Sequence, residues 1–157
     1  TYKHFPGLGR VTANTDTSAG VVDSTTNRST DAAVGVFANA IAAGAQVIMV
    51  SSATYTLIDA SAPAVFSSKI VTEMGFSGVV ITDDVSAAAQ VQGVAAGDRA
   101  VQAIRAGCDI VLASAEPAVA ADMVKALIAA AQSDPAFAAR VDESAARVLA
   151  LKGSLQS

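Results

Sequence analysis

The chain has 157 residues, of which 52% are hydrophobic and 15% are charged. This composition excludes intrinsic disorder, and the length is sufficient for one domain with a substantial core. The net charge of −4 comes without a cluster of basic residues, which argues against a nucleic-acid partner, and no apolar run approaches the roughly 18 residues of a transmembrane helix.

Short apolar strands alternate with longer, alanine-rich helices along the chain. In chain order we expect the end of a strand at 1–5, a polar loop at 7–30, a helix at 31–43, a strand at 46–50, a helix at 63–74, a strand at 78–82, a helix at 94–106, a strand at 109–113, and helices at 117–132 and 142–152. The strands lack two-residue alternation, as is typical of parallel strands that are buried on both faces.

This βα repetition predicts an α/β fold. Four βα units make half of a (βα)₈ TIM barrel, which normally needs about 250 residues. We therefore expect residues 1–153 to form half of such a barrel domain and 154–157 to form a tail. A half barrel by itself has two open sheet edges. The long polar loop at 7–30 is of a kind that is usually functional or mobile.

Cys108 is the only cysteine, so no internal disulfide can form. It lies at the start of an apolar strand, at the end opposite to the active face of a barrel. We expect a buried structural thiol rather than a nucleophile.

An acidic pair, Asp83 and Asp84, directly follows the apolar run 78–81. In α/β barrels the catalytic groups lie at the C-terminal ends of strands, on the loops that lead to the helices. The pair is therefore a candidate for catalysis. The alternative is that one of the two aspartates caps the next helix.

Lys3 and His4 lie side by side at the end of the first expected strand, before Pro6, Gly7 and Gly9 turn the chain into the polar loop. Both side chains can donate hydrogen bonds to sugar hydroxyls. The pair is thus a candidate substrate-binding motif, and the alternative is an ordinary pair of polar residues at a strand end.

Two motifs together resemble glycoside hydrolase family 3. The first is Lys-His-Phe-Pro-Gly-x-Gly at 3–9, and the second is Gly-Phe-x-Gly-Val-Val-x-Thr-Asp-Asp at 75–84. The match is closest to the β-N-acetylglucosaminidase branch of the family, which acts on cell-wall-type sugars. Residues 106–112 also resemble the last barrel strand of the family, and 140–152 its closing helix. The resemblance covers nearly all of this chain and corresponds to the C-terminal half of the family's barrel, about its last four βα units.

The resemblance implies a retaining, double-displacement glycosidase that acts on terminal non-reducing β-linked N-acetylglucosamine or related β-glycosides, as in bacterial cell-wall recycling. It implies Asp83 as the nucleophile and Lys3 and His4 as ligands of the sugar hydroxyls. Asp84 is the alternative nucleophile, or else a supporting or helix-capping residue. It implies no metal site and no organic cofactor. The expected partners are a carbohydrate substrate and the N-terminal half of the barrel, from the same gene product or from a cleaved chain.

The polar loop departs from the family pattern. Where the branch has Asp-Ser-His, with the histidine as acid/base, an ungapped count places Asn14, Thr15 and Asp16. The only histidine, His4, belongs to the sugar-binding motif. A retaining glycosidase still needs a proton donor, and Asp16 is the candidate acid/base. The alternative for Asp16 is an aspartate that forms a turn in the loop.

Two other functions are compatible with the sequence. The missing Asp-His dyad fits a catalytically weak relative that binds glycans without turnover. An unrelated barrel enzyme of phosphorylated metabolites is the other alternative, and against it no glycine-rich phosphate cradle stands at the start of a late helix.

Overall fold

The computed structural model describes residues 1–28 and 31–155. Its central element is a parallel sheet of four strands, in the order β1 (Tyr2–Phe5), β3 (Val47–Val50), β5 (Val79–Asp84) and β6 (Ile110–Leu112). Strand order follows chain order, so the sheet grows in one direction, as it does in a barrel. A doubly wound sheet would instead reverse direction partway.

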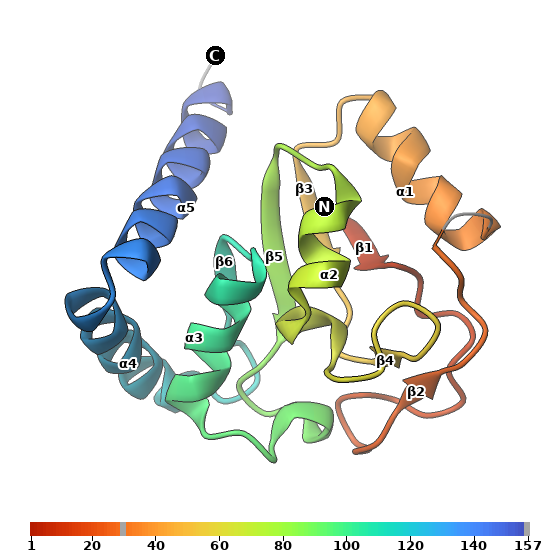
Figure 1. The fold of residues 1–157 in the computed structure, drawn as a ribbon, viewed down its shortest axis with the longest axis horizontal. Coiled ribbons are helices and arrows are strands. Elements are labelled where there is room, and N and C mark those ends of the chain that lie inside the picture. The colour runs from red at the N-terminus through yellow and green to blue at the C-terminus, as the bar shows by residue number, and fades with distance from the viewer. Residues whose placement is uncertain (29–30, 156–157) are drawn as a thin grey trace.

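Helices connect these strands, as the βα repetition predicts (Figure 1). The α-helices of the described residues are α1 (Ala32–Ala42), α2 (Ser68–Val71), α3 (Ala96–Ala106), α4 (Ala120–Ser133) and α5 (Pro135–Ser154). Short 3₁₀ segments are η1 (Ala64–Phe66), η2 (Thr72–Met74), η3 (Ala89–Val91) and η4 (Pro117–Val119). Most expected helices and strands are present within three residues of their expected limits. Across the described residues, no helix combines the length and apolarity needed to cross a bilayer.

One expected helix, at 63–74, is wrong as a single element. The segment is broken into η1, α2 and η2, because Ser67 adopts an extended backbone with φ −97° and ψ 106°. The Ser67 hydroxyl accepts a hydrogen bond from the Ile70 amide at 3.2 Å and donates one to Asp59 at 2.5 Å. Ser67 therefore starts a new helix instead of continuing the preceding turn.

The last helix begins earlier than expected. Asp134 caps α5, because its carboxylate accepts hydrogen bonds from two backbone amides of the first turn, at 3.0 and 3.2 Å. Pro135 follows in the first helical turn, where its missing N–H is not needed. The helix continues through Ser154, so only the end of the expected tail at 154–157 lies beyond it, and residues 156–157 are outside the described residues.

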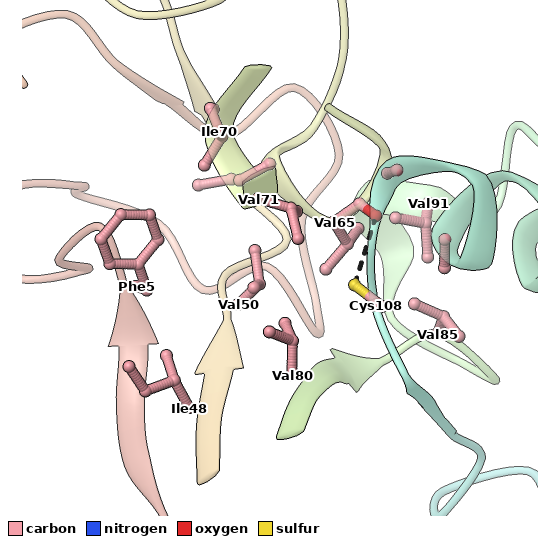
Figure 2. Close-up of a cluster of buried hydrophobic side chains, with 14 of the residues drawn as sticks. Phe5, Ile48, Val50, Val65, Ile70, Val71, Val80, Val85, Val91 and Cys108 are labelled. Carbon is pink, nitrogen blue, oxygen red and sulfur yellow. Dashed lines mark hydrogen bonds between the residues drawn. The ribbon is translucent and has the colours of Figure 1, made fainter. Parts of the chain in front are cut away.

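The hydrophobic core lies between the sheet and the helices (Figure 2). Val50 and Val80 of the strands pack in one cluster with Val65 and Val71 of the η1–α2 segment. Cys108 belongs to the same cluster, and its thiol donates a long hydrogen bond of 3.9 Å to the carbonyl of Val65. Burial raises the pKa of Cys108 to about 12, so the thiol stays protonated at neutral pH. The expectation of a buried structural thiol is confirmed.

The polar segment 7–30 is more ordered than an irregular loop. It contains the strand β2 (Val22–Asp23), which pairs in parallel with β4 (Thr54–Tyr55) in a small second sheet. The Asp23 carboxylate is buried and accepts hydrogen bonds from the amide and hydroxyl of Thr26, at 2.7 and 2.6 Å. Residues 29–30 lie outside the described residues.

The four-stranded sheet is open on both sides. Among the described residues, β1 and β6 each pair with only one strand. Beside β6, an apolar groove of approximately 540 Å³ lies between the strand, α4 and α5, and is lined by Val111, Met123, Leu127 and Val148 among others. At the other edge, Phe5 and side chains of α1 line a smaller groove of approximately 300 Å³.

Candidate active site

The C-terminal ends of the strands meet around one pocket of approximately 390 Å³. The four site residues expected from the sequence, Lys3, His4, Asp16 and Asp83, all line this pocket. Lys3 and His4 lie in β1 and Asp83 lies in β5, so parallel strands bring these residues to a common edge. Among the side chains that the structure describes, no group of three or more His, Cys, Asp or Glu is arranged to hold a metal ion.

The two adjacent aspartates at the end of β5 have different surroundings, because successive side chains of a strand point to opposite faces. Asp83 points into the pocket, on the face of the sheet that also carries Met49 of β3. The carboxylate of Asp84 is turned toward the loop that follows β6, where it accepts hydrogen bonds from Ser114. The pleat of the strand thus directs the carboxylates of two consecutive residues to different sides.

Asp83 is a mostly buried carboxylate with a histidine and a lysine nearby. Its side chain is 16% exposed, and its Oδ2 lies 3.8 Å from Nε2 of His4. Its Oδ1 accepts a hydrogen bond of 2.9 Å from the backbone N–H of Asp84. Burial raises the pKa of Asp83, the Asp84 amide and the charges of His4 and Lys3 act against this rise, and the nearby Asp16 adds to it. Such a group is a candidate for chemistry, because its protonation is set by specific neighbours in a pocket.

Asp84 supports the surrounding loops and does not cap a helix. The next helical segment, η3, has Ala88 at its cap position and no side-chain cap. Asp84 instead accepts hydrogen bonds from Ser86, Ser114 and Ala115. Burial alone would raise the pKa of Asp84, but these donors outweigh it and hold the pKa well below the usual range.

Asp16 reaches the pocket on a loop whose backbone is held in place. The carbonyls of Asp16 and Thr15 accept hydrogen bonds from the amides of Ala89 and Gln90, both at 3.0 Å. The Gln90 side chain in turn accepts from the Val21 amide at 2.7 Å and donates to the Val21 carbonyl at 3.1 Å. The loop is therefore tied at two points to the segment that follows β5.

The Asp16 carboxylate itself is unengaged. It is exposed, and among the described residues it accepts no hydrogen bond and forms no ion pair. The local turn is made by Asn14, whose side-chain oxygen accepts a hydrogen bond of 2.8 Å from the Asp16 amide. The turn-forming role considered for Asp16 thus belongs to Asn14, and the Asp16 carboxylate is free to face a ligand.

Sequence reasoning missed several residues of this site. Ser114 follows β6 by two residues, a strand-end position that is itself a usable signal. Met49 lies within an expected strand, but which strand face lines the pocket depends on the sheet. Gln90 carried no local signal, because its partner Val21 is 69 positions away in the chain.

Comparison with known proteins agrees with the family resemblance of the two motifs. Residues 1–151 match the Glycosyl hydrolase family 3 N terminal domain. The chain is 60% identical to a β-N-acetylhexosaminidase from Beutenbergia cavernae DSM 12333, with a TM-score of 0.94 over 96% of this chain. It is 30% identical to a glycoside hydrolase family 3 β-N-acetylglucosaminidase from Paenibacillus sp. str. FPU-7, with a TM-score of 0.86 over 96% of this chain. Over 71% of its length it is 41% identical to a β-hexosaminidase from Xylella fastidiosa (strain M23).

The chain therefore belongs to glycosyl hydrolase family 3, as the two motifs predict. Its fold is the α/β, TIM-barrel type expected from the βα repetition. The chain spans 46% of the Beutenbergia protein, 30% of the Paenibacillus protein and 35% of the Xylella protein. It thus corresponds to less than half of the length of each of these relatives.

Proposed function

We propose that the protein carrying this chain is a retaining glycosidase that removes terminal non-reducing β-linked N-acetylglucosamine. The observation that carries the proposal is the position of Asp83, at a strand end in a pocket, 3.8 Å from His4. The Beutenbergia, Paenibacillus and Xylella relatives, named as β-N-acetylhexosaminidase, β-N-acetylglucosaminidase and β-hexosaminidase, support the substrate class.

Asp83 is the proposed nucleophile. Its ionised carboxylate attacks the anomeric carbon, the bond to the leaving oxygen breaks, and a covalent glycosyl-enzyme forms. Water then attacks the same carbon and releases the carboxylate, so the anomeric configuration is retained. Because burial disfavours the charged form of Asp83, the positive charges of His4 and Lys3 help to keep it ionised before attack.

Asp16 is the proposed acid/base. It lies in the same pocket as Asp83, and its charge is close enough to raise the Asp83 pKa. As a carboxylic acid it donates its proton to the leaving oxygen in the first step. As a carboxylate it takes a proton from the attacking water in the second step. Retaining enzymes hold their two carboxyl groups about 5–5.5 Å apart, a spacing that we expect once substrate is bound.

Lys3 and His4 are the proposed ligands of the sugar hydroxyls. Both line the pocket beside Asp83, on the strand next to β3. Their N–H groups match the acceptor oxygens of a sugar ring. His4 therefore has two tasks, to hold the sugar and to stabilise the ionised nucleophile.

Residues 1–153 are proposed to be the C-terminal half of the barrel. Among the described residues, β1 and β6 are open edges of the sheet. The groove beside β6 is lined by apolar side chains, as is typical of a surface that is buried against another part of a fold. The relatives are more than twice as long as the matched segment. We therefore assign the other four βα units to an N-terminal half from the same gene product or a cleaved chain, which would cover both edges.

A second function is a glycan-binding relative without turnover. The observation that favours it is the loop, where Asn14, Thr15 and Asp16 replace the family's Asp-Ser-His. Hydrolysis of an aryl β-N-acetylglucosaminide by the full-length protein separates the two functions. Binding of N-acetylglucosamine without hydrolysis would establish the second.

The test of the nucleophile uses the full-length protein and a mechanism-based fluorosugar. Peptide mapping should find the label on Asp83, and Asp83→Asn should lower kcat on the order of 10⁴-fold without unfolding. Exposed Asp122, changed to Asn, is the matched control and should keep full activity. A label on Asp84, or full activity in Asp83→Asn, would refute the assignment.

A further inference from the structure

A hydrogen-bond network behind the proposed nucleophile links three segments of the chain. Asp84 Oδ1 accepts hydrogen bonds from the amide and hydroxyl of Ser86, at 2.6 and 2.5 Å. Asp84 Oδ2 accepts from the hydroxyl of Ser114 and the amide of Ala115, at 2.7 and 2.6 Å. The Ser86 hydroxyl also accepts a hydrogen bond of 2.9 Å from the Glu116 amide. One carboxylate therefore fixes the loop after β5 to residues 113–116, which we call the wall loop.

A buried arginine completes the network from the helix layer. Arg99 of α3 is 5% exposed and donates hydrogen bonds to the carbonyls of Val85 and Ser86. Its positive charge lies close enough to interact with Asp84. A buried carboxylate and a buried guanidinium thus offset each other's charge while they hold the same short segment.

The wall loop forms one side of the candidate active site. Ser114 and Ala115 both line the pocket that contains Asp83 and His4. Asp84 holds both residues in place, because its carboxylate accepts hydrogen bonds from the backbone amides of Ser114 and Ala115, at 3.3 and 2.6 Å. Asp84 lines the pocket as well, and it also holds the loop that forms this side of the pocket.

We propose that Asp84 is a positioning residue for sugar binding, which holds the wall loop against the β5 strand end and so sets the shape of the sugar subsite beside Asp83. This inference rests on the proposed function. It separates the tasks of the acidic pair: Asp83 acts on the anomeric carbon, and Asp84, which also lines the pocket, shapes the subsite through the wall loop that it holds. The hydrogen bond that Asp83 receives comes from the backbone of residue 84 and survives a change of its side chain.

The test compares Asp84→Asn, Ser114→Ala and Ser114→Thr in the full-length protein. In Asp84→Asn, the new NH₂ group faces N–H and O–H donors and cannot accept their hydrogen bonds. In Ser114→Ala, the hydroxyl that donates to Asp84 is lost. Both changes are therefore expected to loosen the wall loop. We expect KM for an aryl β-N-acetylglucosaminide and Kd for N-acetylglucosamine to rise about tenfold in Asp84→Asn and about threefold in Ser114→Ala, as one or more hydrogen bonds are lost. We expect kcat to change by less than about threefold, and Ser114→Thr, which keeps the hydroxyl, to behave like the unaltered protein.

A serine outside the network serves as the control. Ser133→Ala, at the exposed end of α4, removes a hydroxyl that bonds only within its own helix and should change neither constant. If Asp84→Asn does not fold, Ser114→Ala with its threonine rescue carries the test. Unchanged KM and Kd in Ser114→Ala, or a loss of kcat in Asp84→Asn as large as that of Asp83→Asn, would overturn the inference. A Kd shift in a protein that never hydrolyses the glycoside would uphold the inference and refute the proposed hydrolysis.

Discussion

Nε2 of His4 lies 3.8 Å from Oδ2 of Asp83, so a side chain of the proposed sugar-binding motif also faces the proposed nucleophile. Burial raises the Asp83 pKa and the charge on His4 lowers it, so the protonation of the proposed nucleophile depends on a residue two strands away in the sheet. The relationship couples sugar binding to the pH dependence of the reaction.

His4→Gln is expected to move the acid limb of the kcat/KM profile to higher pH. Asp83 must be ionised to attack, so activity falls as the pH drops through its pKa, and removal of the imidazolium raises that pKa. KM should also rise about tenfold, because hydrogen bonds to the sugar are lost. The measurement is kcat/KM of the full-length protein from about pH 4 to about pH 9. Lys125→Gln, a change of an exposed cation, is the control, and an acid limb that stays in place would contradict the prediction.

Asp83→Asn is expected to make the protein more stable at neutral pH. The folded-state pKa of Asp83 is raised, so the unaltered protein loses stability as the pH rises through that pKa, whereas the neutral amide does not. The gain in melting temperature should therefore be present at pH 7 and vanish below the ordinary aspartate pKa of about 3.9. Such a gain is typical of an active-site charge that is kept for function at a cost in stability.

Thermal unfolding of the two proteins at several pH values checks this expectation. Asp122→Asn, at an exposed position, should show no such pH-dependent gain. A lower melting temperature for Asp83→Asn at pH 7 would show that the carboxylate stabilises the fold.

Asp16→Asn is expected to affect substrates with poor leaving groups far more than activated aryl glycosides. A good leaving group departs without a proton, so only the poor one needs the acid's contribution of about 10²–10⁴-fold. Azide should restore turnover of activated substrates by Asp16→Asn, because it attacks the glycosyl-enzyme without a base. Equal losses on both substrate classes, or no loss, would assign the proton donor to another group.

Asp109→Ala is expected to destabilise the fold without altering the site. The buried carboxylate of Asp109 accepts hydrogen bonds from Arg140 at 2.8 Å, Arg147 at 3.1 Å and Ser144 at 3.1 Å, and so ties α5 to β6. Its loss leaves the buried Val80 amide and two partly exposed arginines without this acceptor, at a cost of about 1–3 kcal/mol in the free energy of unfolding. Denaturant unfolding should show this loss, while kcat of the folded protein stays unchanged because Asp109 lies at the opposite end of the strand.

The matched control is Asp122→Ala. Asp122 and Lys125 form an ion pair of 3.4 Å between side chains that are 71% and 79% exposed. A change there should cost less than about 1 kcal/mol. A similar loss for both variants would show that the Asp109 cluster contributes no more than a surface pair.

The parts of the fold that were predictable from the sequence are those with a local cause. The strand β5 and its acidic end were visible because a fully apolar run stops abruptly at Asp83. The start of α5 had a local signal as well, a capping aspartate before Pro135, which the apolar periodicity of the later turns concealed.

Other features depend on distant contacts and left no mark in the local pattern. The break in the expected helix at 63–74 follows from the hydrogen bond between Ser67 and Asp59. The strand β2 forms because β4 lies beside it, more than thirty residues away in the chain. For the site, strand ends predicted Lys3, His4 and Asp83, but not the network around Asp84.

The two attachments of the Asp16 loop have a consequence for how this family member can evolve. The Asp16 carbonyl is bonded to Ala89, and Val21 is clamped by the Gln90 side chain. The residues between them, 17–20, form a tip that is mostly exposed. Insertions and substitutions in this tip can accumulate while the carboxylate beside it keeps its place. Under the proposed function, changes in the tip could therefore alter which groups bind beyond the first sugar while the proposed acid/base keeps its position.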